Sequence, residues 1–260
     1  MKVVFLGDIV GRPGRKLVKE YLPQLIRKYT PDLTVVNGEN AAGGFGLTLD
    51  VATELLQNGV DVITLGNHTW KHKEINQVLA DYKQILRPAN YPPGTPGEGA
   101  GIFVARNGYP VGVLSLMGQV YLEPALDCPF RIGREKVSLL KQKTPYVLVD
   151  FHAEATSEKV ALGHYLDGLA SAVVGTHTHV ATADQTILPG GTGYITDLGM
   201  CGPAVSVLGV KKELAIQKFV TKRPVKFELA TGPVELNGIY LEMDQQGRTT
   251  LIDRIYYRKN

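Results

Sequence analysis

Short apolar runs that each end in a polar, ligand-type residue are the strongest constraint on how this chain folds. The first run, Val3–Leu6, leads directly into Gly7-Asp8, and the second, Leu33–Val36, leads into a segment that contains Glu39. Continuous apolar runs of this length are typical of strands covered on both faces. Apolar residues at helical spacing lie between the runs, and the resulting β-α-β alternation predicts an α/β fold with parallel strands.

The same pattern continues along the chain. We expect further strands at Val60–Leu65, Gly101–Ala105, Val111–Leu116, Tyr146–Phe151 and Ala172–Val174, and helices near Pro13–Ile26, Thr48–Leu56, Lys73–Tyr82, Arg134–Gln142 and Ser157–Leu169. The last third reads differently, with strand-like runs at Gly193–Thr196, Val225–Leu229, Gly238–Met243 and Thr249–Tyr257 and one helix near Lys211–Phe219. Turns between these late strands predict a second, partly antiparallel sheet packed on the first.

Composition sets the general class of protein. The 260 residues include 28 basic and 25 acidic side chains spread along the chain, a net charge of +3 that gives no strong nucleic-acid or membrane signature. No segment approaches the roughly 18 consecutive apolar residues of a membrane span. Two cysteines provide no disulfide framework, which favours the reducing cytoplasm. We therefore expect one cytoplasmic domain over residues 1–260 and leave open whether it forms a homo-oligomer.

Metal-ligand side chains gather where the predicted strands end. Open α/β sheets place their binding crevice at the carboxyl ends of strands, so ligands that follow different strands meet at one edge. Four of the six histidines occur in these positions, together with carboxylate and amide side chains. The candidate metal ligands are Asp8, Glu39, Asn40, Asn67, His152, His177 and His179.

These candidates differ in how strongly each indicates a metal. Asp8 could equally be a surface carboxylate, and the two asparagines could be ordinary turn residues. Glu39 is harder to explain in that way, because an ionised carboxylate at a buried strand end needs a cationic partner. His177 and His179 lie two residues apart, so on an extended segment both rings would face one site, and His152 adds a third imidazole from a remote strand.

The donor set indicates the kind of metal and the kind of reaction. Carboxylates, amides and imidazoles without thiolates suit two divalent ions, Mn or Fe in the first place and Zn as a further option. Two ions about 3.5–4 Å apart need a shared ligand, and we assign that bridge to Glu39. Such a pair can bind phosphate oxygens and hold a hydroxide for in-line attack, which is phosphate-ester hydrolysis. His68 could then protonate the leaving group as a general acid.

The order and spacing of these motifs resemble the calcineurin-like metallophosphoesterase superfamily. Its marks are a Gly-Asp pair, an acidic bridge, Gly-Asn-His, a later single histidine and a Gly-His-x-His motif. Here they stand as Gly7-Asp8, Gly38-Glu39-Asn40, Gly66-Asn67-His68, His152 and Gly175-Thr176-His177-Thr178-His179.

The match departs from the superfamily pattern in three ways. Thr176 is an extra residue in the last motif, Glu39 replaces the usual bridging aspartate, and Ile9-Val10 follow Asp8 where the superfamily has Asp-x-His. The resemblance implies that Asn40 takes the place of the missing imidazole.

The chain as a whole looks like a small bacterial branch of this superfamily that is associated with cyclic-nucleotide phosphodiesterase activity. The resemblance implies a sandwich of two packed mixed β-sheets flanked by helices, and 2′,3′- or 3′,5′-cyclic nucleotides as substrates. It also implies that Asp8, Glu39, Asn40 and His179 hold one ion, that Glu39, Asn67, His152 and His177 hold the other, and that His68 is the proton donor.

Other interpretations remain. A regulatory or scaffold protein could keep the metals and sense a nucleotide without turnover, and the missing histidine is the argument for it. The glycine-rich segment Gly7–Gly14 matches neither dinucleotide-binding nor P-loop patterns, and no nucleophile elbow supports a serine esterase. Phe45 could stack on a base or anchor its loop. Asp197 and Cys201 could line the pocket or be structural.

Overall fold

Two mixed β-sheets form the centre of the molecule. The structure, a computed structural model, describes residues 1–260. Sheet A has the strand order β13-β12-β11-β1-β2-β3-β4, and sheet B has the order β5-β6-β7-β8-β10-β9. Sheet A contains β1 (Lys2–Ile9), β2 (Leu33–Asn37), β3 (Val62–Thr64), β4 (Ile85–Leu86), β11 (Met200–Pro203), β12 (Val234–Met243) and β13 (Thr249–Lys259). Sheet B contains β5 (Ala100–Val104), β6 (Pro110–Met117), β7 (Val147–His152), β8 (Ala172–Thr176), β9 (Thr186–Ile187) and β10 (Gly193–Ile195).

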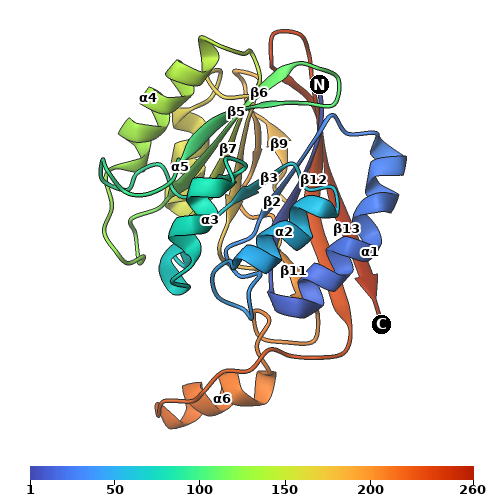
Figure 1. Cartoon of the computed structure of the whole chain (residues 1–260), viewed down its shortest axis with the longest axis vertical. Helices are drawn as coiled ribbons and strands as arrows, with labels where there is room; N and C mark the ends of the chain where they lie inside the picture. Colours follow the sequence, from blue (N-terminus) through green and yellow to red (C-terminus); the bar gives the residue numbers. More distant parts are fainter.

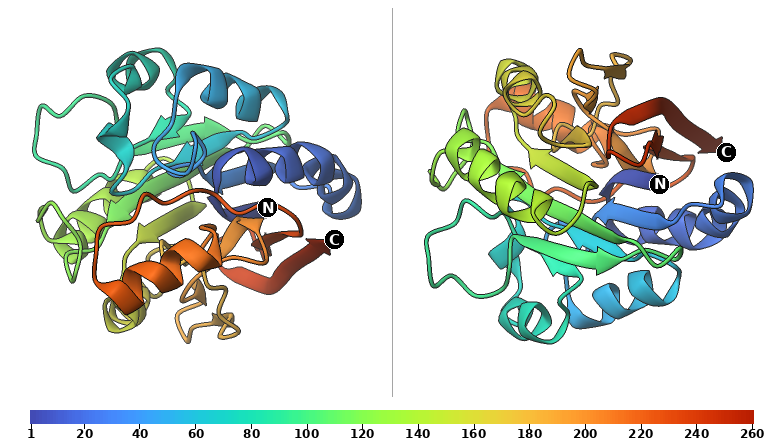
Figure 2. Two further views of the ribbon diagram at one scale, coloured as in Figure 1. Left: turned by 90° about the horizontal axis from the view of Figure 1, so that it is seen from below. Right: turned by 90° about the horizontal axis from the view of Figure 1, so that it is seen from above.

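Helices cover the two outer faces of this pair of sheets (Figures 1 and 2). Buried side chains of α1, α2 and α3 pack on sheet A, and those of α4 and α5 pack on sheet B. The helices are α1 (Gly11–Tyr29), α2 (Leu49–Gln57), the short 3-10 helix η1 (Thr69–Lys71), α3 (Ile75–Asp81), α4 (Pro129–Lys141), α5 (Thr156–Tyr165) and α6 (Lys212–Thr221). This layering confirms the predicted sandwich of two mixed sheets flanked by helices.

The layer between the sheets is an apolar core of 19 buried residues. Phe5 of β1 is fully buried in it, together with Val35 of β2 and Ile239 of β12 from sheet A, and Val113 and Leu148 from sheet B. Strands covered on both faces must be apolar at every position, which explains the continuous runs in the sequence. The hydrophobic effect therefore holds the two sheets together.

Parallel pairing brings strand ends together. In sheet A, β1, β2, β3 and β4 run parallel to one another, and in sheet B the same holds for β6, β7, β8 and β10. The carboxyl ends of each set therefore lie at one edge. Residues at or just after the ends of β1, β2, β3, β7 and β8 are the ones that the sequence marks as ligands.

The expected assignment of the late strands was wrong. β12 and β13 do not form a second sheet but extend sheet A, because β12 pairs antiparallel with β1 from Lys2↔Glu242 to Leu6↔Gly238. Sheet B is instead built from residues 100–195. Alternation of apolar residues identifies a strand but does not identify its partner. The short strands β4, β9 and β11 were not expected, since two to four residues are too few to show a period.

The strand expected at Val225–Leu229 does not form either. Only an isolated bridge between Val210 and Leu229 is present there. This segment belongs to an arm between β11 and β12, residues 204–233, which carries α6 away from the body of the molecule (Figure 1). No neighbouring strand is available in the arm, so the alternation at 225–229 serves a different purpose, described below.

The outer part of the arm is exposed. Phe219 and Val220 of α6 are 67% and 77% exposed, respectively, and Ala215 is the one buried residue of that helix. None of the helices combines the length and apolar character that crossing a bilayer requires.

Burial predicts very different consequences for two phenylalanines. We expect Phe5→Ala to lower the free energy of unfolding by roughly 3–5 kcal/mol, because it leaves a cavity between the sheets. The same change at exposed Phe219 should cost no more than about 0.5 kcal/mol. Urea unfolding monitored by circular dichroism measures both values. Equal losses for the two variants would contradict the role assigned to the layer between the sheets.

Candidate active site

All eight side chains singled out from the sequence meet at the shared edge of the two sheets. Sheet A supplies Asp8 within β1, Glu39 and Asn40 after β2, and Asn67 and His68 after β3. Sheet B supplies His152 at the end of β7, and His177 and His179 after β8. Segments far apart in the sequence are brought together by the parallel strands of both sheets.

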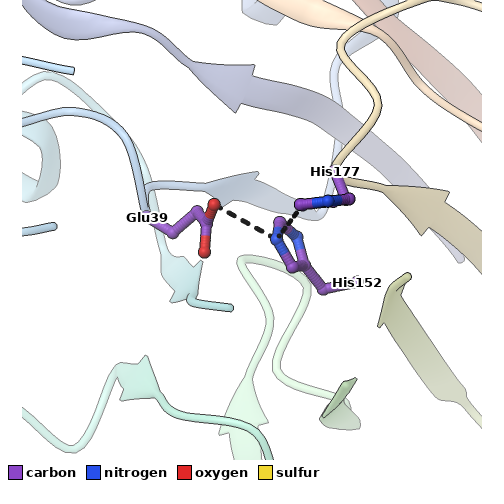
Figure 3. Close-up of side chains that lie close together, drawn as sticks. All are labelled: Glu39, His152 and His177. Carbon is purple, nitrogen blue, oxygen red and sulfur yellow. Dashed lines mark hydrogen bonds and ion pairs between the residues drawn. The ribbon is translucent and has the colours of Figure 1, made fainter. Parts of the chain in front are cut away.

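Glu39 lies at the centre of this group. Its side chain is fully buried, and its Oε1 is 3.1 Å from His152 Nε2 and 3.1 Å from His68 Nδ1. Burial raises the pKa of Glu39, but His152 and His68 outweigh that effect and hold the pKa well below its usual value. Glu39 is therefore an ionised carboxylate among imidazoles. Figure 3 shows Glu39 and His177 both directed at His152.

Three side chains offer ligand atoms at a spacing that suits one metal ion. The ligand atoms of Glu39, His152 and His177 all lie within 4.8 Å of one another, and His177 Nδ1 is 3.0 Å from His152 Nε2. Asn67 Oδ1 lies 3.0 Å from the same His152 nitrogen. These four donors therefore converge on one point, and they come from both sheets.

A second group of donors lies beside the first. Asn40 Oδ1 is 2.8 Å from His68 Nδ1, and Asn40 Nδ2 is 3.0 Å from His179 Nε2. Asp8 Oδ1 lies 3.8 Å from His179 Nε2 and 3.9 Å from His152 Nδ1. Glu39 also touches Asn40, so it is common to both groups.

The environment of the Asp8 carboxylate shows whether these donors fit a divalent ion. Its Oδ1 is buried and has no hydrogen-bond partner. Burial raises the pKa of Asp8 to about 6, although His179 and His152 act in the opposite direction. An isolated buried carboxylate oxygen is costly, and a cation next to it removes the cost. Together with the oxygen and imidazole donors around it, this orphaned oxygen fits a divalent metal ion.

The backbone of the last motif differs from expectation. His177 and His179 do face one site, but not on an extended segment, because both have left-handed backbone, with φ of 101° and 65°. Such conformations cost of order 1–3 kcal/mol each for residues other than glycine. Asp197 holds the loop in place, since its Oδ2 accepts hydrogen bonds from Thr178 N (3.1 Å) and Thr178 Oγ1 (2.8 Å). Buried Lys159 neutralises Asp197 at 2.6 Å.

Residues beneath His152 were missed by the sequence analysis. The Thr176 hydroxyl donates to Asp150 Oδ1 at 2.8 Å and lies 2.9 Å from His152 Nδ1. Because its only proton goes to Asp150, the hydroxyl oxygen accepts the His152 Nδ1–H. Nε2 is then the ring nitrogen that faces Glu39, Asn67 and His177. One signal was visible, since Asp150 interrupts the apolar run at 147–151, where an unpartnered charge would be costly.

Glu154 lies at the site, whereas Cys201 lies behind it in the protein interior. Glu154, which was not predicted, lies 3.1 Å from His177 Nε2 and is 48% exposed. Cys201 is buried and donates to the carbonyl of Asn237, and burial raises the pKa of its thiol to about 12. Neither Cys201 nor Asp197 lines the cavity. Cys201 is therefore a structural residue, and Asp197 supports the loop through Thr178.

A cavity of about 230 Å³ opens beside the cluster. Glu39, Asn40, His68, His177 and His179 line one part of it. The remainder is largely apolar and comes from the glycine-rich loop at Phe45 and from the base of the α6 arm. Carboxylate and imidazole groups thus face a space that a small molecule can enter.

Comparisons with known proteins agree with this architecture. The chain is 51% identical to a 2′,3′-cyclic-nucleotide 2′-phosphodiesterase of Bacillus subtilis (strain 168) over 256 residues, which covers 98% of this chain and 96% of that protein. A solved structure described as a novel phosphatase from Mycoplasma pneumoniae superposes with a TM-score of 0.93 at 37% identity and covers 99% of this chain and 93% of that chain. A hypothetical protein from Thermus thermophilus superposes with a TM-score of 0.92 at 43% identity, and the match covers all of both chains.

These relatives confirm the resemblance that the motifs indicated. A family described as YmdB-like protein matches residues 4–255, almost the whole chain. On the basis of this match, the protein belongs to the YmdB-like family.

Proposed function

We propose that this chain is a metal-dependent phosphodiesterase, that it acts as a single domain over residues 1–260, and that its substrates are 2′,3′-cyclic nucleotides. The observation that carries the proposal is the fully buried Glu39 carboxylate in contact with His68 and His152 from the two sheets. The 51% identity to the Bacillus subtilis 2′,3′-cyclic-nucleotide 2′-phosphodiesterase supports this substrate rather than 3′,5′-cyclic nucleotides.

Two divalent ions, Mn or Fe in the first place and Zn as a further option, match the donor set. Asp8, Glu39, Asn40 and His179 would hold one ion, and Glu39, Asn67, His152 and His177 would hold the other. When bound, the ions supply positive charge for the phosphate oxygens and a nucleophilic water at neutral pH. Asn40 would stand in, through its amide oxygen, for the imidazole that Ile9-Val10 cannot provide, and its side chain lies beside His179, with Nδ2 3.0 Å from His179 Nε2.

His68 is the proton donor in this scheme. Opening the 2′,3′-cyclic phosphate adds water to phosphorus and breaks the bond to the 2′-oxygen, which must then gain a proton. His68 Nδ1 is held by Glu39 (3.1 Å) and Asn40 (2.8 Å), so Nε2 is the nitrogen left for proton transfer. The ring lines the cavity, where a leaving oxygen can reach it.

Asp150 and Thr176 are positioning residues for His152. The hydrogen bonds from His152 Nδ1 to Thr176 and from Thr176 to Asp150 select one tautomer and one ring orientation. Partners behind a metal-ligating histidine commonly have this effect. Thr176, the extra residue in the Gly-Thr-His-Thr-His motif, therefore has the role of orienting His152.

Removing the Glu39 carboxylate tests the proposed function. Wild-type protein supplied with Mn²⁺ should convert 2′,3′-cyclic AMP to adenosine 3′-phosphate, and a chelator should stop the reaction. Glu39→Ala should lower kcat/KM more than about 100-fold and lower the metal content, because changes behind a ligand alone cost 10–100-fold. Elemental analysis and product chromatography measure both, with Glu135→Ala on the exposed face of α4 as the control. A metal-replete, fully active Glu39→Ala protein would contradict the bridge, and wild-type binding without turnover would favour a nucleotide sensor.

Replacing His68 tests the proton donor. His68→Ala should keep its metal and lose roughly 10²–10⁴-fold in kcat on 2′,3′-cyclic AMP, because the poor 2′-oxygen leaving group needs a proton. The loss should nearly disappear with bis-p-nitrophenyl phosphate, whose leaving group departs as an anion. Steady-state kinetics on both substrates decide the matter. An equal defect on the two would exclude general acid catalysis by His68.

Thr176 offers a test of the support behind His152. Thr176→Val keeps the shape but removes the hydroxyl, so metal affinity should fall by about 10–100-fold. Thr176→Ser keeps the hydroxyl and should retain the wild-type affinity. Calorimetric titration with Mn²⁺ measures the affinity, and nitrogen-detected NMR of the imidazoles reports the His152 tautomer. Unchanged affinity and tautomer in Thr176→Val would remove Thr176 from this role.

A further inference from the structure

The part of the active-site cavity away from the metal ligands is an apolar wall built from two segments. Phe45 comes from the glycine-rich loop after β2, and Leu208, Val210, Phe227 and Leu229 come from the base of the α6 arm. Phe45 is 48% exposed and Phe227 is half-buried, so both rings have surface to offer to a ligand. Of the apolar alternation at 225–229, Phe227 and Leu229 thus line a cavity and are not part of a sheet.

The base of the arm is fixed to the body of the protein. Leu229 packs so closely on the glycine-rich segments that a Cβ added to Gly11 would lie 2.2 Å from its Cδ1, and one added to Gly44 would lie 3.1 Å from its Cδ2. Val210 and Leu229 pair across the two sides of the arm, and the Leu208 carbonyl lies 3.1 Å from His179 Nδ1. The part of the apolar wall that comes from the arm therefore packs on the glycine-rich segments and contacts His179.

The two rings are positioned by separate neighbours. Phe45 meets the His68 ring edge to face, with centroids 5.0 Å apart. The Lys218 ammonium lies 4.9 Å from the centroid of the Phe227 ring. The His68 contact restricts the Phe45 ring, and Lys218 lies over one face of the Phe227 ring. Aromatic side chains bind a base by stacking a ring face on the π-face of the base.

The two ends of the cavity differ in polarity. His68, His177 and His179 line one end, with Glu154 beside His177, and the apolar wall forms the other end, where the exposed carboxylate of Glu228 is paired with Lys211. The phosphate therefore belongs with the imidazoles and the proposed ions, and the uncharged, flat part of a ligand belongs with the apolar wall. The cavity of about 230 Å³ is small beside pockets of roughly 300–1,000 Å³ for drug-sized ligands, which suits a mononucleotide better than a longer chain.

From these observations we infer that Phe45 and Phe227 form a nucleobase subsite, which makes this protein selective for a cyclic mononucleotide over other phosphodiesters. The inference rests on the proposed function, because it assigns the remainder of the same substrate. Recognition by stacking tolerates any base, so the subsite accepts purines and pyrimidines.

The test compares 2′,3′-cyclic AMP with ribose 2,3-cyclic phosphate, which has the same reacting group but no base. Wild-type, Mn²⁺-loaded protein should favour the nucleotide by about 10-fold or more in kcat/KM. Phe227→Ala and Phe45→Ala should each lose about 10-fold on the nucleotide, mainly through KM, so that the preference collapses. Phe227→Tyr keeps a stacking ring and should retain the preference.

Phe219→Ala is the matched control, because Phe219 lies in the same arm, is 67% exposed and does not line the cavity. It should keep the wild-type preference. Equal wild-type kcat/KM values for the two substrates would overturn the subsite, and so would an equal loss on both substrates in the Phe227→Ala and Phe45→Ala proteins. If Phe227→Ala fails to fold, the wild-type comparison and Phe45→Ala decide the question.

Failure of the proposed function gives a different result. In that case wild-type protein hydrolyses neither cyclic phosphate, and binding of adenosine 3′-monophosphate and of ribose phosphate is measured by calorimetry. Tighter binding of the nucleotide that is lost in Phe227→Ala would support the subsite without the reaction. Equal binding of the two compounds would overturn it.

Discussion

A buried negative charge is the constraint around which the rest of this structure is arranged. Glu39 is fully removed from water, and burying an ionised carboxylate is tolerable only beside positive charge. Imidazoles from both sheets surround it, and the nearby Asp8 oxygen has no hydrogen-bond partner. The fold therefore concentrates negative charge and neutral donors where a divalent ion would relieve the cost. This arrangement makes the site suited to phosphate chemistry.

Such a site needs support from behind. Asp150 and Thr176 orient His152, while Asp197, neutralised by Lys159, holds the left-handed loop that carries His177 and His179. Each charged group among them has a partner: Asp197 pairs with Lys159, and Asp150 accepts a hydrogen bond from Thr176. A strained backbone persists only when its surroundings determine it completely, and here the strain falls on residues at the site.

The arm between β11 and β12 contributes most of the apolar wall of the cavity. Its base packs on the glycine-rich segments at Gly11 and Gly44, while α6 extends into solvent. Glycine suits these two positions because φ is positive, 55° at Gly11 and 101° at Gly44, and because a Cβ at either would crowd Leu229. A polar cluster and an apolar wall thus face the same cavity, and such a combination is typical of sites for small ligands.

The sequence alone determined the α/β class, most helices and strands of the first 176 residues, and the eight side chains that meet at the shared sheet edge, because apolar period and ligand chemistry are local properties. Only the tertiary structure decided that β12 and β13 join sheet A, since strand pairing depends on which edge is free and not on alternation. It also decided that residues 227–229 line a cavity, that His177 and His179 have left-handed backbone, and that Thr176 and Asp150 stand behind His152. Each of these depends on contacts between residues distant in sequence, and no local pattern encodes them.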